Sequence, residues 1–403
     1  MEINMSNNKF YTPDGFTDQL PEICAFKREA EGKLREVFTG AGYKEIETPG
    51  VEYCDIYTST GLLKAEDLYK FCDQKGRLLC ARYDGTVPAV RFAANLYKDE
   101  PLPLRLCYIE NMYRFNQMGG GKQSGFTQAG VEFMGAKGSE ADSEVIAIAI
   151  ESALAIGIKD LQISIGQVKF FDGIAGQFGL SDESKERIRT AIQLKDLVTI
   201  KNTAKESGLS KTDEETLLML MECQGGYEVI EQFRSRVTDS GAIAALDNLK
   251  EILDILGEYG YQKYITVDLG LIGSEDYYTG VIFKGYTYEV GFPIIGGGRY
   301  DNVAELFGRT MEAVGFSMSL TLAITALMRQ GVEFKNEQAS AIVGFDRSIK
   351  GARAKAIALA KALREEYTSV ILDSEGMSEE ELDQYSDLNN IPATFYVNEG
   401  DEE

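Results

Sequence analysis

The segment from 102 to 135 constrains the fold more than any other part of this 403-residue chain. Two stretches in which apolar and polar residues alternate, 104–113 and 126–134, flank a glycine-rich connection. Alternation with a period of two is typical of β-strands, and such a connection between two strands indicates a hairpin. We therefore predict two long antiparallel strands joined by an extended tip.

Polar side chains fall at defined places on this hairpin. Arg114 closes the first strand, and Gln128 and Glu132 lie four residues apart on the second, hence on one face of a pleated strand. A guanidinium suits a carboxylate or phosphate and Glu132 suits an ammonium, so the set indicates a site for a small zwitterion. Considered alone, the same residues are better explained by a solvated strand face with a surface ion pair.

The composition narrows the possible functions. The chain has 64 Asp and Glu against 41 Lys and Arg, a formal charge of −23, and no histidine. A strongly acidic surface repels nucleic acid, and the lack of histidine excludes histidine-based nucleophiles, general bases and metal sites. The six cysteines include no C-x-x-C pair, and no apolar run is long enough to span a membrane. We expect a cytoplasmic protein with no cofactor, no metal and no membrane partner.

Changes between strand and helix patterns along the chain predict an α+β protein whose first domain is interrupted by a helical insertion. Residues 1–175 combine strand patterns with helices at 20–39 and 139–155, helical runs follow over 176–257, and antiparallel strands resume over 258–332. The helical part indicates an inserted domain, in which one helix begins at a capping box at Thr212. Residues 336–403 alternate short strands with helices, an order typical of a small parallel sheet.

Three short segments have both a structural and a functional explanation. A D-G-T corner places Asp84 and Thr86 at a strand-to-helix junction, where helix capping by Thr86 would suffice as the reason. Tyr277 and Tyr278 are adjacent on a predicted strand, so they face opposite sides, and a buried core tyrosine explains either. The glycines 296–298 lack a phosphate-loop sequence and favour a tight turn with close backbone approach.

The order of several motifs resembles the class II histidyl-tRNA synthetases and their relatives along essentially the whole chain. The matching motifs are Y-x-E-I-E-T-P (43–49), R-Y-D-G-T (82–86), Y-R (113–114), F-T-Q-A-G-V-E (126–132), D-Y-Y-T-G (276–280) and G-G-G-R-Y-D (296–301). The resemblance implies a class II antiparallel sheet with flanking helices, a helical insertion and a small C-terminal α/β unit like a truncated anticodon-binding domain. It also implies an amino-acid pocket, for which the candidate residues are Asp84, Thr86, Arg114, Gln128, Glu132, Tyr277 and Tyr278.

Departures from the synthetase pattern lie where the resemblance places the reacting groups. Gly273 and Leu322 stand at positions that are arginines in the family, and Asn116 stands at the position of a glutamate. Loss of one preorganised donor to a developing charge costs roughly 10²–10³ in rate, so we expect little adenylate formation and no catalytic residues. Three consecutive glutamates, 379–381, lie where a tRNA-facing segment would carry lysines, and we expect no tRNA partner.

A retained amino-acid pocket with altered ATP chemistry resembles the family of ATP phosphoribosyltransferase regulatory subunits. That resemblance implies a non-catalytic chain that pairs with a short-form catalytic subunit, self-associates as a dimer or larger oligomer, and confers feedback inhibition by histidine. Histidine would occupy either the synthetase-like pocket or the interface with the partner. Two alternatives remain: an active histidyl-tRNA synthetase, and a free-standing amino-acid sensor or paralogous ligase.

Overall fold

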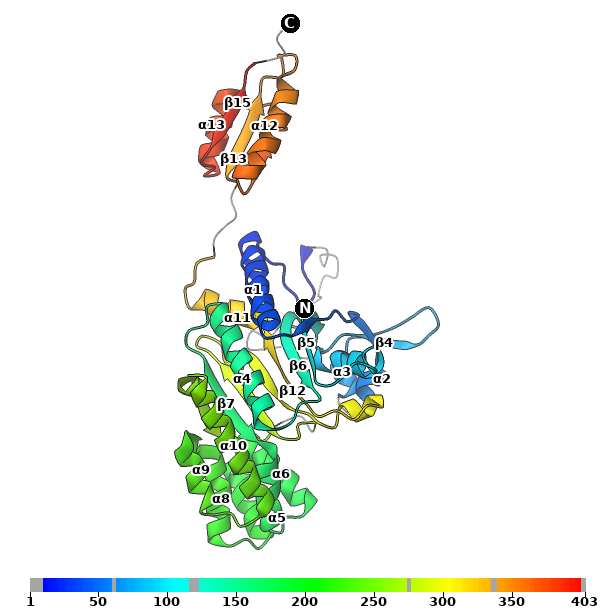
Figure 1. Ribbon diagram of the computed structural model, residues 1–403, viewed down its shortest axis with the longest axis vertical. Helices are drawn as coiled ribbons and strands as arrows, with labels where there is room; N and C mark the ends of the chain where they lie inside the picture. Colours follow the sequence, from blue (N-terminus) through cyan, green and yellow to red (C-terminus); the bar gives the residue numbers. More distant parts are fainter. Residues whose placement is uncertain (1–9, 60–62, 116–122, 274–276, 335–338, 400–403) are drawn as a thin grey trace, which may run out of the picture. The chain divides into compact units, whose positions relative to one another are not determined.

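The computed structural model of the chain describes residues 10–59, 63–115, 123–273, 277–334 and 339–399. Within these residues the chain forms two compact units, built mainly from Lys27–Glu333 and from Phe334–Glu403. The first unit contains a nine-stranded sheet, and the second contains a separate three-stranded sheet (Figure 1).

The large sheet of the first unit has the strand order β1-β5-β6-β12-β11-β10-β7-β9-β8. Its central pairs are antiparallel, whereas β1 runs parallel to β5 and β9 runs parallel to β7. The strands are β1 (Lys44–Glu45), β5 (Leu104–Tyr113), β6 (Gly125–Met134), β7 (Gln162–Gln167), β8 (Gln224–Gly225), β9 (Ile265–Asp268), β10 (Val281–Tyr286), β11 (Ile295–Arg299) and β12 (Ala313–Ser319).

The predicted hairpin is confirmed as the pair β5 and β6. The two strands are in register from Leu104 opposite Met134 to Tyr113 opposite Gly125. Alternation along β6 sends Phe133 to the helix-covered face, where its ring lies 6.2 Å from that of Tyr43. Because side chains alternate, the even-numbered residues of β6 point to the opposite face of the sheet.

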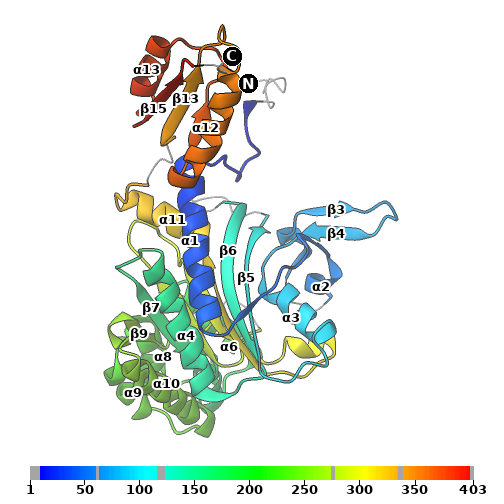
Figure 2. The same ribbon diagram turned by 45° about the horizontal axis from the view of Figure 1, so that its top comes forward.

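Helices cover the face of the sheet that carries these aromatic rings. Helix α1 (Pro21–Gly40) buries Leu34 and Phe38 at a spacing of four, and the Phe38 ring lies 6.2 Å from Phe316 of β12. Helices α4 (Gly138–Ala155) and α10 (Ser240–Glu258) pack on the same sheet, as Figure 2 shows for α1 and α4. The other face therefore stays available for a site.

A small sheet and a short helix border that other face. The sheet has the order β2-β4-β3 and precedes helix α3 in the chain. The elements are β2 (Val51–Tyr53), α2 (Asp55–Thr58), the 3₁₀ helix η2 (Ala65–Asp67), β3 (Lys70–Cys72), β4 (Leu78–Ala81) and α3 (Thr86–Asn95).

Helices dominate the segment between β7 and β9, which also contributes the two-residue strand β8. The capping box occurs at Ser210 rather than at Thr212: the Ser210 hydroxyl accepts from the Asp213 amide, and the Asp213 carboxylate accepts from the Ser210 amide, each at 3.2 Å. Ser210 is the last extended residue before the helix, which fixes it as the cap. The helices are α5 (Val168–Gln177), α6 (Asp182–Gln193), α7 (Leu197–Glu206), α8 (Lys211–Glu222), α9 (Tyr227–Arg234) and α10.

Three strand predictions after residue 258 are wrong in detail. Strand β9 pairs parallel with β7 and antiparallel only with β8. Tyr277 and Tyr278 precede β10 and do not lie on a strand. The glycines 296–298 form the middle of strand β11, not a turn. A Cβ at Gly297 would lie 2.5 Å from both the Gly315 carbonyl oxygen and the Phe283 ring, so close approach is the reason for glycine there.

The remaining elements of the first unit are short, apart from one helix that follows the last strand of the large sheet. They are η3 (Gln262–Tyr264), η4 (Ala304–Phe307) and helix α11 (Leu320–Arg329). None of the helices in the described ranges combines the length and apolar composition needed to cross a membrane.

The second unit has the strand and helix order predicted for it. Its strands are all parallel, with the spatial order β14-β13-β15. Its elements are β13 (Ala341–Phe345), α12 (Ala352–Glu366), β14 (Val370–Leu372), α13 (Glu379–Leu388) and β15 (Thr394–Val397).

Candidate ligand-binding site

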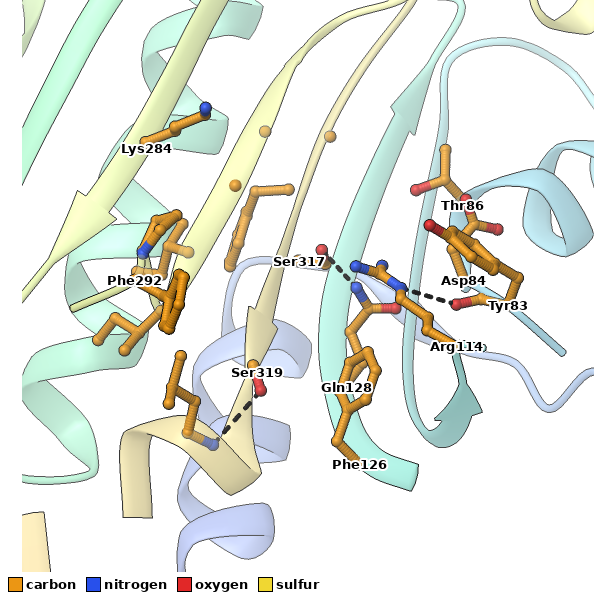
Figure 3. Close-up of a pocket in the computed structure, with 18 of the residues that line it drawn as sticks. Tyr83, Asp84, Thr86, Arg114, Phe126, Gln128, Lys284, Phe292, Ser317 and Ser319 are labelled. Atoms are coloured by element: carbon orange, nitrogen blue, oxygen red, sulfur yellow. Dashed lines mark hydrogen bonds between the residues drawn. The ribbon is translucent and has the colours of Figure 1, made fainter. Parts of the chain in front are cut away.

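A cavity of about 260 Å³ lies on the face of the large sheet opposite α1 (Figure 3). This volume is slightly below the roughly 300–1,000 Å³ that is usual for small-molecule sites. Six of the seven predicted site residues line it, and Glu132 does not. The six are Asp84, Thr86, Arg114, Gln128, Tyr277 and Tyr278.

Small residues in register across the strands form the floor of the cavity. Gly296 of β11 lies opposite Ser317 of β12 and opposite Lys284 of β10. Ser317 in turn lies opposite Gly130 of β6. A Cβ built at Gly296 would meet no atom within 4 Å, so the floor is open at that point.

Gln128 is held firmly between two neighbouring strands and the D-G-T corner. Its side-chain carbonyl accepts from the Gly85 amide at 3.2 Å, and its amide nitrogen donates to the Ser317 hydroxyl at 2.6 Å. Gln128 is only 5% exposed, so these bonds fix which way the amide points. The carbonyl oxygen retains a second lone pair, which can accept a hydrogen bond from a cationic ligand.

Arg114 reaches the cavity from the end of β5. Its Nε donates to the Tyr83 carbonyl at 3.2 Å, and its guanidinium lies 4.7 Å from the centroid of the Tyr83 ring and 5.1 Å from that of Phe126. Stacking on two aromatic faces orients the planar guanidinium. Neither terminal nitrogen of Arg114 hydrogen-bonds to another residue of the described ranges, and both are placed to bind a carboxylate or phosphate.

Thr86 does not cap helix α3, although capping would have explained a threonine at this position. The cap of α3 is Gly85, and the carboxylate of Asp84 accepts from the Val87 amide at 3.3 Å. The Thr86 hydroxyl instead acts on two buried groups, since it lowers the pKa of both Glu132 and Tyr108. The D-G-T corner thus places Asp84 at the wall of the cavity and the Thr86 hydroxyl near the buried Glu132 carboxylate.

Glu132 lies beneath the cavity floor and is completely buried. Its carboxylate accepts from the hydroxyl of Tyr108 at 3.2 Å and from the hydroxyl of Tyr300. A Cβ at Gly315 would lie 2.0 Å from a Glu132 oxygen, so only glycine can cover it. Burial raises the pKa of Glu132 to about 8, although the hydroxyls of Tyr300, Thr86 and Tyr108 each lower it. The strand period correctly predicted the face of the sheet on which Glu132 lies, but Glu132 is buried beneath the cavity and does not line it.

Tyr277 and Tyr278 both line the cavity, with ring centroids 4.6 Å apart. The Tyr277 ring also lies 6.4 Å from that of Tyr300. A Cβ at Gly298 would lie 2.8 Å from the Tyr278 ring, so the strand beneath leaves room for this tyrosine. Because neither residue lies on a strand, they do not face opposite sides as predicted.

Most of the lining residues were not among the sequence candidates, and they include Lys284, Phe292 and Ser317. The alternation of β10 gave a signal for Lys284, since it is a charged residue within an otherwise apolar strand. Phe292 and Ser317 lie in segments without a distinguishing pattern, and only the strand pairing brings them to the cavity.

Gly273 and Leu322, the two positions at which the resemblance to the synthetases implies arginines, differ in their surroundings. Leu322 lines the cavity from the first turn of α11, and its amide donates to the Ser319 hydroxyl at 3.3 Å. Gly273 has a φ of +74°, and its carbonyl accepts from the Gln193 side chain. Asn116 lies outside the described residues. No group of three Cys, Asp or Glu among the described residues is arranged to hold a metal ion.

Comparison with solved structures shows the class of protein. The structure is similar to a crystal structure from Bacillus halodurans, described as an ATP phosphoribosyltransferase regulatory subunit/histidyl-tRNA synthetase, with a TM-score of 0.86, 31% identity, and coverage of 97% of this chain and 98% of that one. Histidyl-tRNA synthetase from a Nostoc species shares the fold at a TM-score of 0.80 and 21% identity, covering 95% and 90% of the two chains. A family model described as histidyl-tRNA synthetase matches residues 15–322. The fold and the cavity therefore define a class II synthetase-like protein, which confirms the predicted fold class.

Comparison with curated proteins gives the family. A relative from Acetivibrio thermocellus, described as an ATP phosphoribosyltransferase regulatory subunit, is 41% identical over 394 residues, which are 98% of this chain and 94% of that one. A relative of the same description from Ruminiclostridium cellulolyticum is 37% identical over 398 residues, with the same two coverages. The chain belongs to the family of ATP phosphoribosyltransferase regulatory subunits.

Proposed function

We propose that this chain is the non-catalytic regulatory subunit of an ATP phosphoribosyltransferase, required for the first step of histidine biosynthesis and for its feedback inhibition by histidine. The observation that carries the proposal is the match to relatives of that description over 98% of the chain. The partner is a short-form catalytic subunit, which supplies the transferase chemistry. The chain also binds itself, forming a dimer or a larger oligomer in the cytoplasm.

Histidine binds in the cavity. Asp84 and the Gln128 carbonyl receive the α-ammonium, Arg114 pairs with the α-carboxylate, and Tyr278 hydrogen-bonds the imidazole. Tyr277 packs beside Tyr278 and closes that part of the wall. Glu132 acts from below the floor, where a ligand cation favours its ionised form over the protonated one.

The cavity carries no adenylate chemistry. At Leu322 an apolar side chain lines the wall where the family has an arginine, and Gly273 has no side chain at all. Both changes remove a cation from the place where negative charge would develop on the phosphates. In the second unit, the first turn of α13 carries Glu379, Glu380 and Glu381, and such a surface repels tRNA.

Reconstitution tests the proposal as a whole. The chain is mixed with a short catalytic subunit, and formation of phosphoribosyl-ATP is followed with and without histidine. We expect activity only from the mixture, and histidine should inhibit it. Allosteric coupling of about 1–3 kcal/mol corresponds to a several-fold to hundred-fold effect. Full activity of the catalytic subunit alone would contradict the regulatory role. If the chain binds histidine but associates with no catalytic subunit, the result would favour the free-standing sensor.

Calorimetry on the complex tests the location of the histidine site. Gln128→Ala removes a ligand acceptor, and Glu132→Ala removes the carboxylate beneath the floor. Loss of one charge-assisted hydrogen bond should weaken histidine binding by about ten-fold to a hundred-fold. Gln384→Ala, an exposed glutamine on α13, is the control and should leave the affinity unchanged. Unchanged affinity in both cavity variants would place the effector site at the subunit interface.

A further inference from the structure

An exposed apolar cluster lies at the turn between α6 and α7, in the helical part that is drawn below the large sheet in Figure 1. Its members are Leu194, Leu197 and Val198, which are 73%, 42% and 67% exposed. Single exposed apolar residues are common on protein surfaces, but three within five residues concentrate apolar surface in one place. We call these three residues the turn cluster.

The backbone of this turn is held in place by polar contacts. The Lys195 amine donates to the Met221 carbonyl of α8, and the Asp196 carboxylate accepts from the amides of Val198 and Thr199 at 3.1 Å. Lys195 itself has a φ of +56°, a conformation that a residue with a Cβ rarely adopts without such support. The turn cluster is therefore presented in a fixed arrangement, and a partner that binds it orders little further backbone.

A groove of about 520 Å³ lies beside the turn cluster, between α6 and α7. Its charged lining consists of three carboxylates and one guanidinium, those of Glu183, Glu186, Asp196 and Arg187. Arg187 is already paired with Glu206 at 2.8 Å, and Glu186 pairs with Arg189 at 3.3 Å. Glu183 forms no hydrogen bond or ion pair with any residue that the structure describes. The groove is therefore acidic, and Glu183 is placed to receive a cation from outside the chain.

An apolar centre beside an acidic groove matches a partner segment that combines apolar side chains with lysine or arginine. Leu194 belongs to both features, since it is a member of the turn cluster and also lines the groove. The same surface of a second copy is a poor match, because carboxylates would then face carboxylates. The chain as a whole also has 64 acidic residues against 41 basic ones, so a second copy brings further like charge.

The turn is also bonded to the segment that leads into the ligand cavity. Gln193, the last residue of α6, donates to the Gly273 carbonyl. Tyr277 and Tyr278, which line the cavity, follow shortly after Gly273 in the chain. A partner seated on Leu194 therefore lies next to the residue that contacts this segment. This position suits a partner whose activity depends on the ligand in the cavity.

We propose that the turn cluster and the groove beside it form the docking surface for the catalytic subunit, which presents a segment of apolar and basic side chains there. This inference rests on the proposed function, because it takes a short catalytic subunit as the partner. The apolar side chains of that segment cover Leu194, Leu197 and Val198, and a lysine or arginine pairs with Glu183. The apolar contact holds the complex together, and the opposite charges speed its formation.

Sedimentation velocity of the full chain with its short catalytic subunit tests the docking surface. The double variant Leu194→Ser, Val198→Ser changes exposed side chains only, so its thermal unfolding should match that of the wild type. It should bind the catalytic subunit about ten-fold to a hundred-fold more weakly, because the apolar centre of the surface is lost. Leu388→Ser, at an 83% exposed position on α13, removes a leucine of similar exposure and should leave binding unchanged.

Stopped-flow association at several salt concentrations tests the charged part of the surface. Glu183→Lys should slow association about ten-fold at low salt and should make the rate less dependent on salt. Glu231→Lys, at an exposed position on α9, makes the same change in net charge and should have little effect. Equal rates for these two variants would overturn the basic character of the partner segment.

The remaining outcomes separate this inference from the proposed function. Equal affinity of the wild type and the double variant for the catalytic subunit overturns the docking surface and leaves the proposed function standing. A wild-type chain that forms no complex with the catalytic subunit overturns both. If the double variant loses the chain's own oligomer and still binds the catalytic subunit, the turn cluster is an interface between copies of this chain, and the docking surface is overturned.

Discussion

Replacement of the buried carboxylate Glu132 by glutamine should change how stability depends on pH. Glu132 is completely buried, and burial raises its pKa from an ordinary 4.5 to about 8. Between these two values the folded chain holds a proton that the unfolded chain has lost. Because the folded state then binds more protons, the free energy of unfolding falls as the pH rises. Glutamine resembles the protonated carboxyl and has no such dependence.

The size of the effect follows from the two pKa values. The stabilisation is fully present below about pH 4.5 and is lost as the pH rises through about 8. At 1.36 kcal/mol per pKa unit, the wild type should lose on the order of 3–5 kcal/mol relative to Glu132→Gln over this window. Burial also raises the pKa of the carboxyls of Glu52, Glu110 and Asp142, but these groups are present in both chains, so their titration cancels in the difference between wild type and Glu132→Gln.

Urea unfolding of both chains at several values between about pH 5 and pH 9 measures the difference. Tyr300→Phe is a second variant: the Tyr300 hydroxyl lowers the pKa of Glu132, so its removal should move the midpoint to higher pH. A difference between wild type and Glu132→Gln that stays constant across the window would refute the assignment. It would mean that Glu132 is ionised in the folded chain.

Four further outcomes are expected. Histidine-dependent ATP–pyrophosphate exchange by the chain should stay at background, and a clear rate would favour the synthetase alternative. Histidine binding near neutral pH should release protons from Glu132, which calorimetry in buffers of different ionisation enthalpy detects; buffer-independent heats would speak against it. Asp142→Ala removes the carboxylate at 2.7 Å from the buried guanidinium of Arg299 but leaves Asp301 at 3.2 Å, so denaturant curves should show a loss below the roughly 3–5 kcal/mol of a fully unpaired buried charge. Thr203→Val removes a buried hydroxyl that bonds to no described residue, so unfolding should cost about 1 kcal/mol more; a loss of stability would show an overlooked partner.

Patterns within short stretches of sequence were sufficient to predict the central hairpin and the C-terminal sheet. The hairpin of β5 and β6 follows from the period-two tendency of two neighbouring segments and the glycine-rich connection between them, and the parallel C-terminal sheet follows from the order of its elements. The motif order gave the fold class. Six of the seven candidate site residues line one cavity because the motifs keep their spacing along the chain.

Long-range packing decided what the sequence did not show. Glycine is required at 297 and 298 of β11 because the rings of Phe283 and Tyr278 approach them, and nothing near them in sequence indicates that approach. Glu132 is held beneath the floor in part by Tyr300, which is 168 residues away and donates to it from the position after β11. Lys284 joins the site only through the pairing of β10 with β11. Strand period predicts the face of a side chain and is silent on its depth.

The backbone at Gly273 affects how this sequence can diverge. With φ at +74°, any residue bearing a Cβ costs roughly 1–2 kcal/mol there before it makes a contact. A single-base change from Gly273 to arginine therefore lowers the folding stability whether or not the new side chain binds a ligand. An arginine there requires a prior change in the backbone conformation at Gly273 or in Gln193, which donates to the Gly273 carbonyl. A chain with this conformation is thus separated from an arginine at position 273 by more than one mutational step.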